Sequence, residues 1–457
     1  MRNILSNSIR HSALDAESPA KMRLRVKPAM TKNTLLIVYL LCVFMTGSCQ
    51  KPRPPEPPEP PRPQPTFPTK LEIVWNAPFF SDSTYDYFWD YEIANNQYIM
   101  LANIYDRTYN KPRGIGVYNM QTGERHSAWQ NDPGGIFAAT EYEMLQDCKV
   151  AGKNKDIILI YSKDALFGYS LHSGQRLWTV TIRNPIGIPH MSANIDYAFI
   201  NYGNPKSWGR LAMVDVYSGE KRDILRINIE DNYEFTINPP SFYVSNGDTL
   251  LYFTTDGWNF EEVKGNSQAY CYNLTQKQML WVNKQDLSPD GASASQPPPF
   301  VIENDKLIVT ERKAISCLNK HTGELIWQRE GLGGISDTPP LYHEGRLYIR
   351  HGFLNSISYT LLCLDAQSGQ MLWENTTTSP RPAFHGAMAI YKDRLYFSIS
   401  EKSLVCVDIH TGQELWRDKG PYGGISYGVL IDQKTGYLYC NTGWSTLCVD
   451  LNKTPKK

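Results

Sequence analysis

Few side chains in this sequence combine the types and the spacing that catalysis or ligation requires. The acid, amide and aromatic side chains of residues 256–259 (Asp-Gly-Trp-Asn) come nearest to a general-base site, and we interpret them more simply as a loop. His190 and His385 stand at the starts of predicted inner strands, where a ligand role competes with the simpler role of a loop histidine. The sequence contains no His and Cys spacing for zinc and no phosphate-binding glycine loop.

One cysteine has a context for covalent modification. The small residues at 46–48 (Thr-Gly-Ser) precede Cys49, which resembles a bacterial lipobox, where the Cys is lipidated and becomes the first residue. The apolar run at 34–45 is too short to span a bilayer, which needs about 20 residues, but it suits a signal-peptide core. The alternative is a plain signal peptide with an incidental Cys.

The chain divides into four parts. Residues 30–48 are predicted to be a lipoprotein signal peptide that starts at Met30, so residues 1–29 are a mis-assigned start or, alternatively, a long n-region. Residues 49–70 hold the lipidated Cys and a spacer with ten prolines between Pro52 and Pro68. Such a spacer is extended and semi-rigid. Residues 71–457 are the folded domain.

The folded domain repeats one phrase. Residues 317–327 read CLNKHTGELIW, residues 363–373 read CLDAQSGQMLW and residues 406–416 read CVDIHTGQELW. Weaker copies place the same turn at positions 123, 174, 219 and 277, where the copy at 219 lacks its Trp and the copy at 277 lacks its Gly. This spacing is near the roughly 40–50 residues of a four-stranded propeller blade.

Within the phrase, Gly is expected at a positive φ in a tight turn, and Trp is expected to be a buried wedge between blades. We therefore assign a structural role to Trp75, Gly123, Trp129, Gly174, Trp178, Gly219, Trp281, Gly323, Trp327, Gly369, Trp373, Gly412 and Trp416.

The two ends of the domain each hold half a copy. Residues 448–450 (Cys-Val-Asp) begin the phrase at the C-terminus, and residues 71–75 (LEIVW) supply its ending at the N-terminus. Short β-branched or aromatic runs recur throughout, and no segment has a sustained helical period. The prediction is an all-β, eight-bladed β-propeller of four-stranded blades, closed by pairing of its N- and C-terminal strands.

Most cysteines follow the repeat as well. Cysteines at equivalent places in separate blades are too far apart to cross-link and serve as small buried fillers: Cys271, Cys317, Cys363, Cys406 and Cys448. Cys440 and Cys448 flank one predicted hairpin, so a disulfide between them stays open.

The phrase resembles the quinoprotein-type, or PQQ-like, propeller repeat over residues 71–451. That resemblance implies one of two branches: dehydrogenases that hold pyrroloquinoline quinone with calcium, or non-enzymatic lipoproteins similar to the BamB scaffolds of outer-membrane β-barrel assembly. The dehydrogenases hold the quinone near a disulfide of adjacent cysteines, and this sequence has no Cys-Cys pair and no matching calcium cluster. No cofactor or metal is predicted, pyrroloquinoline quinone is disfavoured, and the resemblance favours a protein that is not an enzyme.

The predicted function is a lipid-anchored envelope scaffold that binds other envelope proteins, among them β-barrel assembly components. Lys plus Arg equals Asp plus Glu, at 46 each, which gives no argument for nucleic acid. No Asp follows Cys49, which implies an outer-membrane lipoprotein that faces the periplasm, with surface exposure as the alternative. The alternative functions are a quinoprotein oxidoreductase and a degenerate propeller that binds a small molecule or a glycan, the latter through Trp89, Trp208, Trp258 and Trp444.

Overall fold

The computed structural model describes most of the chain after the spacer. The described residues are 69–78, 91–106, 111–129, 145–162, 165–182, 191–204, 208–228, 233–259, 264–287, 297–303, 305–311, 313–332, 340–352, 358–378, 387–399, 402–421, 424–442 and 445–454. The chain divides after residue 62, and all the described residues belong to the second unit, residues 63–457. The predicted leader, Cys49 and the spacer up to residue 68 lie outside the described residues. No helix in the described part is long and apolar enough to cross a membrane.

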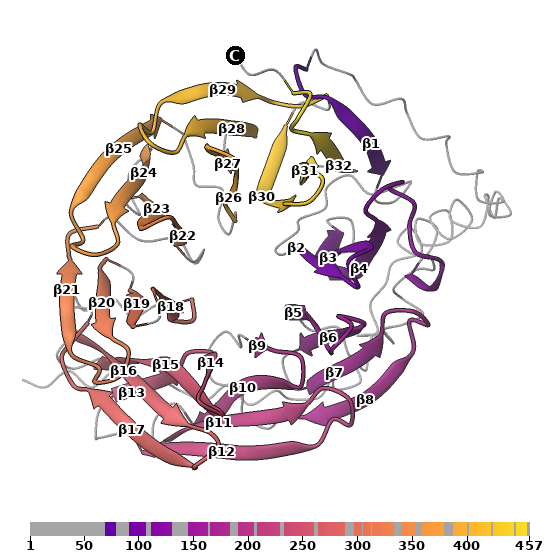
Figure 1. Cartoon of the computed structure of the whole chain (residues 1–457). Coiled ribbons are helices and arrows are strands. Elements are labelled where there is room, and N and C mark those ends of the chain that lie inside the picture. Colours follow the sequence, from indigo (N-terminus) through magenta and orange to yellow (C-terminus); the bar gives the residue numbers. More distant parts are fainter. Residues whose placement is uncertain are drawn as a thin grey trace, which may run out of the picture. The chain divides into compact units, whose positions relative to one another are not determined.

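The described strands form eight antiparallel sheets, which are the blades of a ring (Figure 1). The predicted all-β, eight-bladed propeller is therefore confirmed. Blades 1 to 4 comprise β2 (Tyr91–Ala94), β3 (Tyr98–Asp106) and β4 (Lys111–Asn119); β5 (Leu145–Ala151), β6 (Ile157–Ser162), β7 (Ala165–Ser170) and β8 (Arg176–Thr181); β9 (Met191–Ala193), β10 (Tyr197–Asn204), β11 (Trp208–Asp215) and β12 (Lys221–Asn228); and β13 (Tyr233–Ile237), β14 (Ser241–Ser245), β15 (Asp248–Asn259), β16 (Lys264–Asn273) and β17 (Gln278–Asn283).

Blades 5 to 7 follow one plan of four strands, from the channel outwards. They comprise β18 (Phe300–Ile302), β19 (Lys306–Thr310), β20 (Ile315–Asn319) and β21 (Leu325–Arg329); β22 (Leu341–His343), β23 (Arg346–Gly352), β24 (Ser358–Asp365) and β25 (Met371–Thr378); and β26 (Ala389–Tyr391), β27 (Arg394–Ile399), β28 (Ser403–Asp408) and β29 (Glu414–Asp418).

Blade 8 joins the two ends of the domain. It contains β30 (Ile425–Asp432), β31 (Tyr437–Thr442) and β32 (Ser445–Asp450), and its outer strand is β1 (Ile73–Pro78). β1 pairs with β32 so that Trp75 lies opposite Cys448. The predicted closure of the ring by its terminal strands is confirmed.

Among the described strands, two blades depart from the count of four. Blade 1 has three, because the chain after β4 enters the 3-10 helix η1 (Ser127–Trp129) instead of an outer strand. Blade 4 has five, because β13 and β14 both pair with β15, along its second and its first half respectively.

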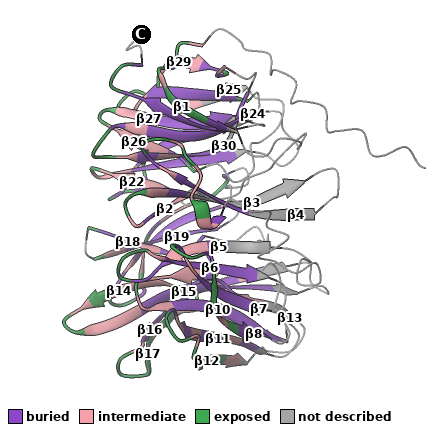
Figure 2. Ribbon diagram, turned by 90° about the vertical axis from the view of Figure 1, so that its right-hand side faces the viewer, coloured by how far each residue is buried: buried purple, intermediate pink, exposed green. Residues whose placement is uncertain are grey.

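The core lies in the seams between neighbouring blades, where the middle strands are buried (Figure 2). Each seam has a Trp–Gly contact when both blades carry the full phrase. Trp327 Nε1 donates to the carbonyl oxygen of Ala366 at 3.2 Å, and a Cβ on Gly369 would lie 2.6 Å from the Trp327 ring. The same Trp-to-carbonyl hydrogen bond is made at 2.7–3.1 Å by Trp75, Trp129, Trp178, Trp281 and Trp373.

The two ends of the ring differ. At one end, the turn end, the first strand of a blade passes to the second and the third to the fourth. At the other end, the loop end, the second strand passes to the third and the fourth passes to the next blade. β22 ends at His343 and β23 begins at Arg346 at the turn end, whereas β17 ends at Asn283 and β18 begins only at Phe300 at the loop end.

Candidate functional site

The turn end is a repeated backbone structure. Asn319 Oδ1 accepts hydrogen bonds from the backbone N–H groups of His321 and Thr322, at 2.8 and 3.0 Å. Gly323 follows at a φ of 76°. Asp408 accepts the same pair of bonds in blade 7. The Asn or Asp of the phrase thus accepts the hydrogen bonds of its own turn. The exposed histidines of these turns, as far as they are described, form no common site.

The loop end carries buried polar side chains instead of apolar ones. Six blades have a buried polar residue at the same position of the second strand, near its loop end. These residues are at most 6% exposed: Asn201, Thr254, Thr310, Arg350, Ser398 and Asn441. Asn201 Nδ2 donates to the carbonyl oxygen of Ile237 at 2.5 Å, which links blade 3 to blade 4. The guanidinium of Arg350 lies 5.5 Å from the centre of the Phe397 ring, which links blade 6 to blade 7. Asn201 and Arg350 thus join neighbouring blades where the loops begin.

Blades 3 to 5 contain most of the departures from the repeat. Blade 3 lacks its Trp, and Arg222 stands opposite Met213 in the register where other blades place Trp opposite Cys. The turn that would have received this Trp, in blade 4, has Lys277 instead of Gly. The loss of Trp in one blade thus explains the loss of Gly in the next. Departures from a sequence pattern usually occur where function requires them.

A buried lysine marks the next seam. Lys320 is 2% exposed and occupies a phrase position that is apolar in the other blades, for example Ala366 and Ile409. Its ammonium lies 3.9 Å from the centre of the Tyr243 ring, on the additional strand β14. The charge is therefore accommodated by a cation–π contact with the additional strand of blade 4.

An acidic group lies at the loop end of the same seam. Asp256 and Glu311 are 5% and 1% exposed. Ser267 Oγ donates to Glu311 Oε1 at 2.6 Å, and Asn238 Nδ2 donates to Asp256 Oδ2 at 3.0 Å. Burial raises the pKa of both carboxyls, and the charge of Asp256 adds to the rise at Glu311. Glu311 Oε2 has no hydrogen-bond partner among the described residues.

The interpretation of residues 256–259 as a loop is wrong. Asp256 belongs to β15, where it pairs with Thr236 of β13 and Ser267 of β16. The inner strand of blade 4 is divided in two, so β15 is longer than its equivalents, and nothing in the phrase announces that division. Gly257 in an otherwise strand-like run was the available signal.

The possible Cys440–Cys448 disulfide is also excluded. Both thiols are free and buried. Cys440 pairs with Leu447, whereas Cys448 pairs with Tyr439, the neighbour of Cys440 on β31. Because successive side chains on a strand point to opposite faces, the two sulfurs lie on opposite faces of blade 8.

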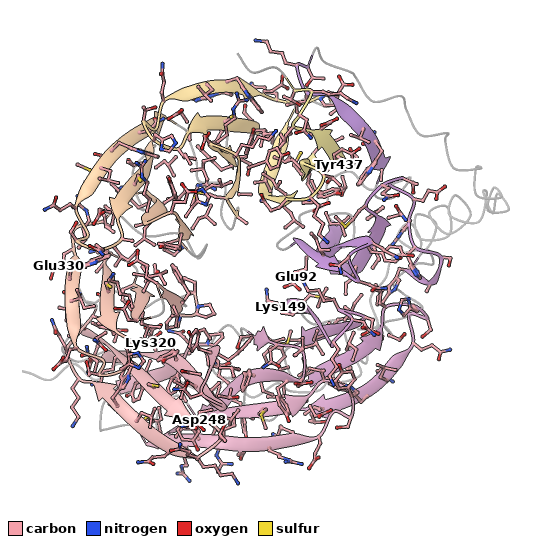
Figure 3. The ribbon with its side chains drawn as sticks, in the orientation of Figure 1. Glu92, Lys149, Asp248, Lys320, Glu330 and Tyr437 are labelled. Atoms are coloured by element: carbon pink, nitrogen blue, oxygen red, sulfur yellow. The ribbon has the colours of Figure 1, made fainter. Side chains whose placement is uncertain are left out.

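Several predicted site residues are not placed. His190, His385, Trp89 and Trp444 lie outside the described residues, and the side chains of Trp208 and Trp258 are not described. In the channel, Lys149 Nζ lies 3.6 Å from Glu92 Oε1, and both residues face the centre of the ring (Figure 3). Among the described residues, no three His, Cys, Asp or Glu side chains gather as metal ligands.

Comparison with known proteins agrees with the repeat. A family model described as outer membrane protein assembly factor BamB matches residues 265–423, from blade 4 to the start of blade 8. Residues 265–423 thus match a PQQ-like repeat family, and the described strands as a whole form an eight-bladed propeller. A search of curated proteins gave no significant match.

Solved structures share the propeller at low identity. BamB from Moraxella catarrhalis is similar with a TM-score of 0.52 and 12% identity, over 83% of this chain and 97% of that chain. Quinohemoprotein alcohol dehydrogenase ADHIIG from Pseudomonas putida HK5 is similar with a TM-score of 0.60 and 13% identity, over 85% and 77%. The computationally designed Ika8 protein has a TM-score of 0.54 and 12% identity, over 83% and 99%. These likenesses establish the fold and leave the function to the site.

Proposed function

We propose that this propeller is a lipid-anchored envelope scaffold that binds other envelope proteins through the loop end of the ring. The observation that carries the proposal is the difference between the two ends. The turn end repeats one hydrogen-bonded turn in blade after blade, whereas the loop end joins the strands by connections of very different length. A rigid ring that presents variable connections at one end is a common arrangement for a binding surface.

Three further features support a scaffold. The family model that matches residues 265–423 describes an outer-membrane assembly factor. The sequence has a lipobox-like stretch at Cys49 and a proline-rich spacer, which together suit a tethered protein. The described end of that spacer is held by the ring: Thr69 Oγ1 and the backbone N–H of Lys70 donate to the Asp418 carboxylate at 2.8 and 2.7 Å. A pull on the tether would therefore be transmitted to blades 7 and 8.

The test is capture from the native envelope of the lipidated protein, followed by mass spectrometry. Recovery of β-barrel assembly components with the wild type, and their loss with Cys49→Ala, is the expected result. A protein that carries no lipid, or that captures no envelope protein under conditions that preserve known assemblies, would refute the scaffold. Stoichiometric quinone in the purified protein would instead support the alternative, an oxidoreductase of the ADHIIG type.

A further inference from the structure

Among the described residues, six of the eight seams share one fastening, which we call the Trp link. In a Trp link, the indole Nε1 of one blade donates to a backbone carbonyl oxygen in the turn after the third strand of the next blade. The link is made by Trp75, Trp129, Trp178, Trp281, Trp327 and Trp373. The described parts of two seams lack it, the seam between blades 3 and 4 and the seam between blades 7 and 8. Four blades separate these two seams in either direction, so they lie on opposite sides of the ring (Figure 1).

The seam between blades 7 and 8 has a Trp that does not form the link. Trp416 Nε1 is buried and has no hydrogen-bond partner among the described residues. In the turn that would receive it, Thr454 donates its backbone N–H to the carbonyl oxygen of Asp450, as Gly369 and Gly412 do with the Asp of their own turns. A Cβ on Gly369 or Gly412 would lie 2.6 or 2.4 Å from the Trp ring of the preceding blade. Thr454 has such a Cβ, which accounts for the missing link.

Residues 69–72, which we call the strap, fasten this seam instead. They come directly before β1, the outer strand of blade 8. Thr69 Oγ1 and the backbone N–H of Lys70 donate to the Asp418 carboxylate of blade 7, at 2.8 and 2.7 Å. Hydrogen bonds to an ionised acceptor are stronger than those between neutral groups. The strap is thus bound to blade 7 by two strong hydrogen bonds.

The second half of the strap packs into the seam and joins blade 8. Leu71 is 6% exposed and belongs to a buried cluster with Leu404 of blade 7 and Leu447 of blade 8. The carbonyl oxygen of Glu72 accepts a hydrogen bond from the backbone N–H of Asp450, at 2.9 Å. The strap therefore bridges the two blades with apolar contacts and hydrogen bonds where Trp416 makes no link.

The opposite seam keeps its packing near the channel. Phe199 of blade 3 stacks on Phe242 of blade 4, with ring centres 6.1 Å apart. Asn201 Nδ2 donates to the carbonyl oxygen of Ile237 across the same seam. These contacts come from the inner two strands of each blade, whereas the outer strand β12 has no Trp and Lys277 replaces the Gly of the receiving turn. A seam that is packed along its inner strands and lacks the outer Trp link can bend without losing its core.

We propose that the strap is a latch and that the seam between blades 3 and 4 is a hinge. Release of the strap lets the ring open between blades 7 and 8, so that blades 4–7 move as one half and blades 8 and 1–3 as the other. Three Trp links join the four blades of each half, so each half stays rigid. Because the strap is continuous with the proline-rich spacer, a pull on the spacer acts first on the latch. The latch is part of the ring itself and works whether or not Cys49 carries a lipid.

The experiment measures distances between pairs of nitroxide labels by double electron–electron resonance on the full-length protein. Labels on cysteines introduced at exposed turn-end positions report each half and the latch. One pair spans the latch, and one pair lies within each half: Gln121 with Gln367 (blades 1 and 6), His321 with His410 (blades 5 and 7), and His172 with Lys453 (blades 2 and 8).

Asp418→Ala and Leu71→Ala each remove one part of the latch, and Glu330→Ala, which removes an exposed acid of blade 5, is the control (Figure 3). Each latch variant should raise the population with a longer Gln121–Gln367 distance at least about tenfold over wild type. The control should match wild type. Both distances within the halves should stay the same in every variant, because the Trp links are intact.

An unchanged Gln121–Gln367 distance in both latch variants would overturn the proposal. Lengthening of either distance within a half would also overturn it, because the opening would then not be confined to the hinge and the latch. Asp418 also accepts the backbone N–H of Gly420 at 2.6 Å, so Asp418→Ala can fail to fold for a reason outside the strap. In that case Thr69→Val, which removes a donor of the strap alone, takes its place in the same comparison.

Discussion

The contact between Trp and Gly across a seam gives a quantitative test of how the ring is held. Gly369 and Gly345 both lie in blade 6 turns at positive φ, 69° and 76°. An added Cβ at Gly369 would lie 2.6 Å from Trp327, whereas a Cβ at Gly345 would meet nothing within 4 Å. An Ala would therefore have similar backbone strain at both positions, but only at position 369 would its Cβ collide with the Trp327 ring.

Gly345→Ala should cost about 1–2 kcal/mol of unfolding free energy, the price of a left-handed Ala. Gly369→Ala should cost this amount and about 1–3 kcal/mol more, because the Trp327 ring must move in a packed seam. Equilibrium unfolding in urea measures both values. A double-mutant cycle with Trp327→Leu should reduce the cost of Gly369→Ala to that of Gly345→Ala. Equal losses of unfolding free energy in the two single Ala variants would refute the idea that this turn requires Gly because the Trp ring lies against it.

Three other predictions concern the irregular seams and the thiols. Lys277→Gly should be neutral or stabilising by up to about 1 kcal/mol in urea unfolding, since it relieves a φ of 55° and no Trp approaches from blade 3; a clear destabilisation would contradict this. Asp418→Ala should cost about 2–4 kcal/mol and expose the Lys70 bond to trypsin, because three donors at 2.6–2.8 Å lose their acceptor; Asp393→Ala, an exposed acid 3.6 Å from His410, is the control and should change stability little. Burial raises the pKa of Cys271, Cys363 and Cys406 to about 11, so these thiols should resist alkylation in the native protein up to about pH 9. The urea-unfolded chain should react, because its thiol pKa values are near 8.5. Rapid labelling of the native protein would contradict the burial.

The ring could be predicted from the sequence because each copy of the phrase forms its turn from its own residues. Asn319, Thr322 and Gly323 build the same turn as Asp408, Thr411 and Gly412, so a pattern read at one place holds at the other. The half copies at the two ends predicted the pairing of β1 with β32 for the same reason. Local rules that recur in register can be read without a structure.

The candidate site was harder to predict, because it departs from the repeat. Ser267 and Glu311 are far apart in the chain and meet only because neighbouring blades stack. A divided inner strand placed Asp256 in β15, opposite Ser267. The absent Trp of blade 3 and the absent Gly of blade 4 were both visible in the sequence. Their connection was not, because the Trp of one blade contacts the turn of the next.

Site-specific photo-cross-linking in the native envelope shows directly which end of the ring binds partners. The cross-linker is placed at three exposed loop-end positions, Glu330, Lys402 and Lys419, and at three exposed turn-end positions, Ser173, His321 and Gln367. If partners bind the loop end, the loop-end positions should capture the same envelope protein and the turn-end positions should capture none. Capture from the turn end alone, or from neither end while the anchored protein is present in the envelope, would contradict it.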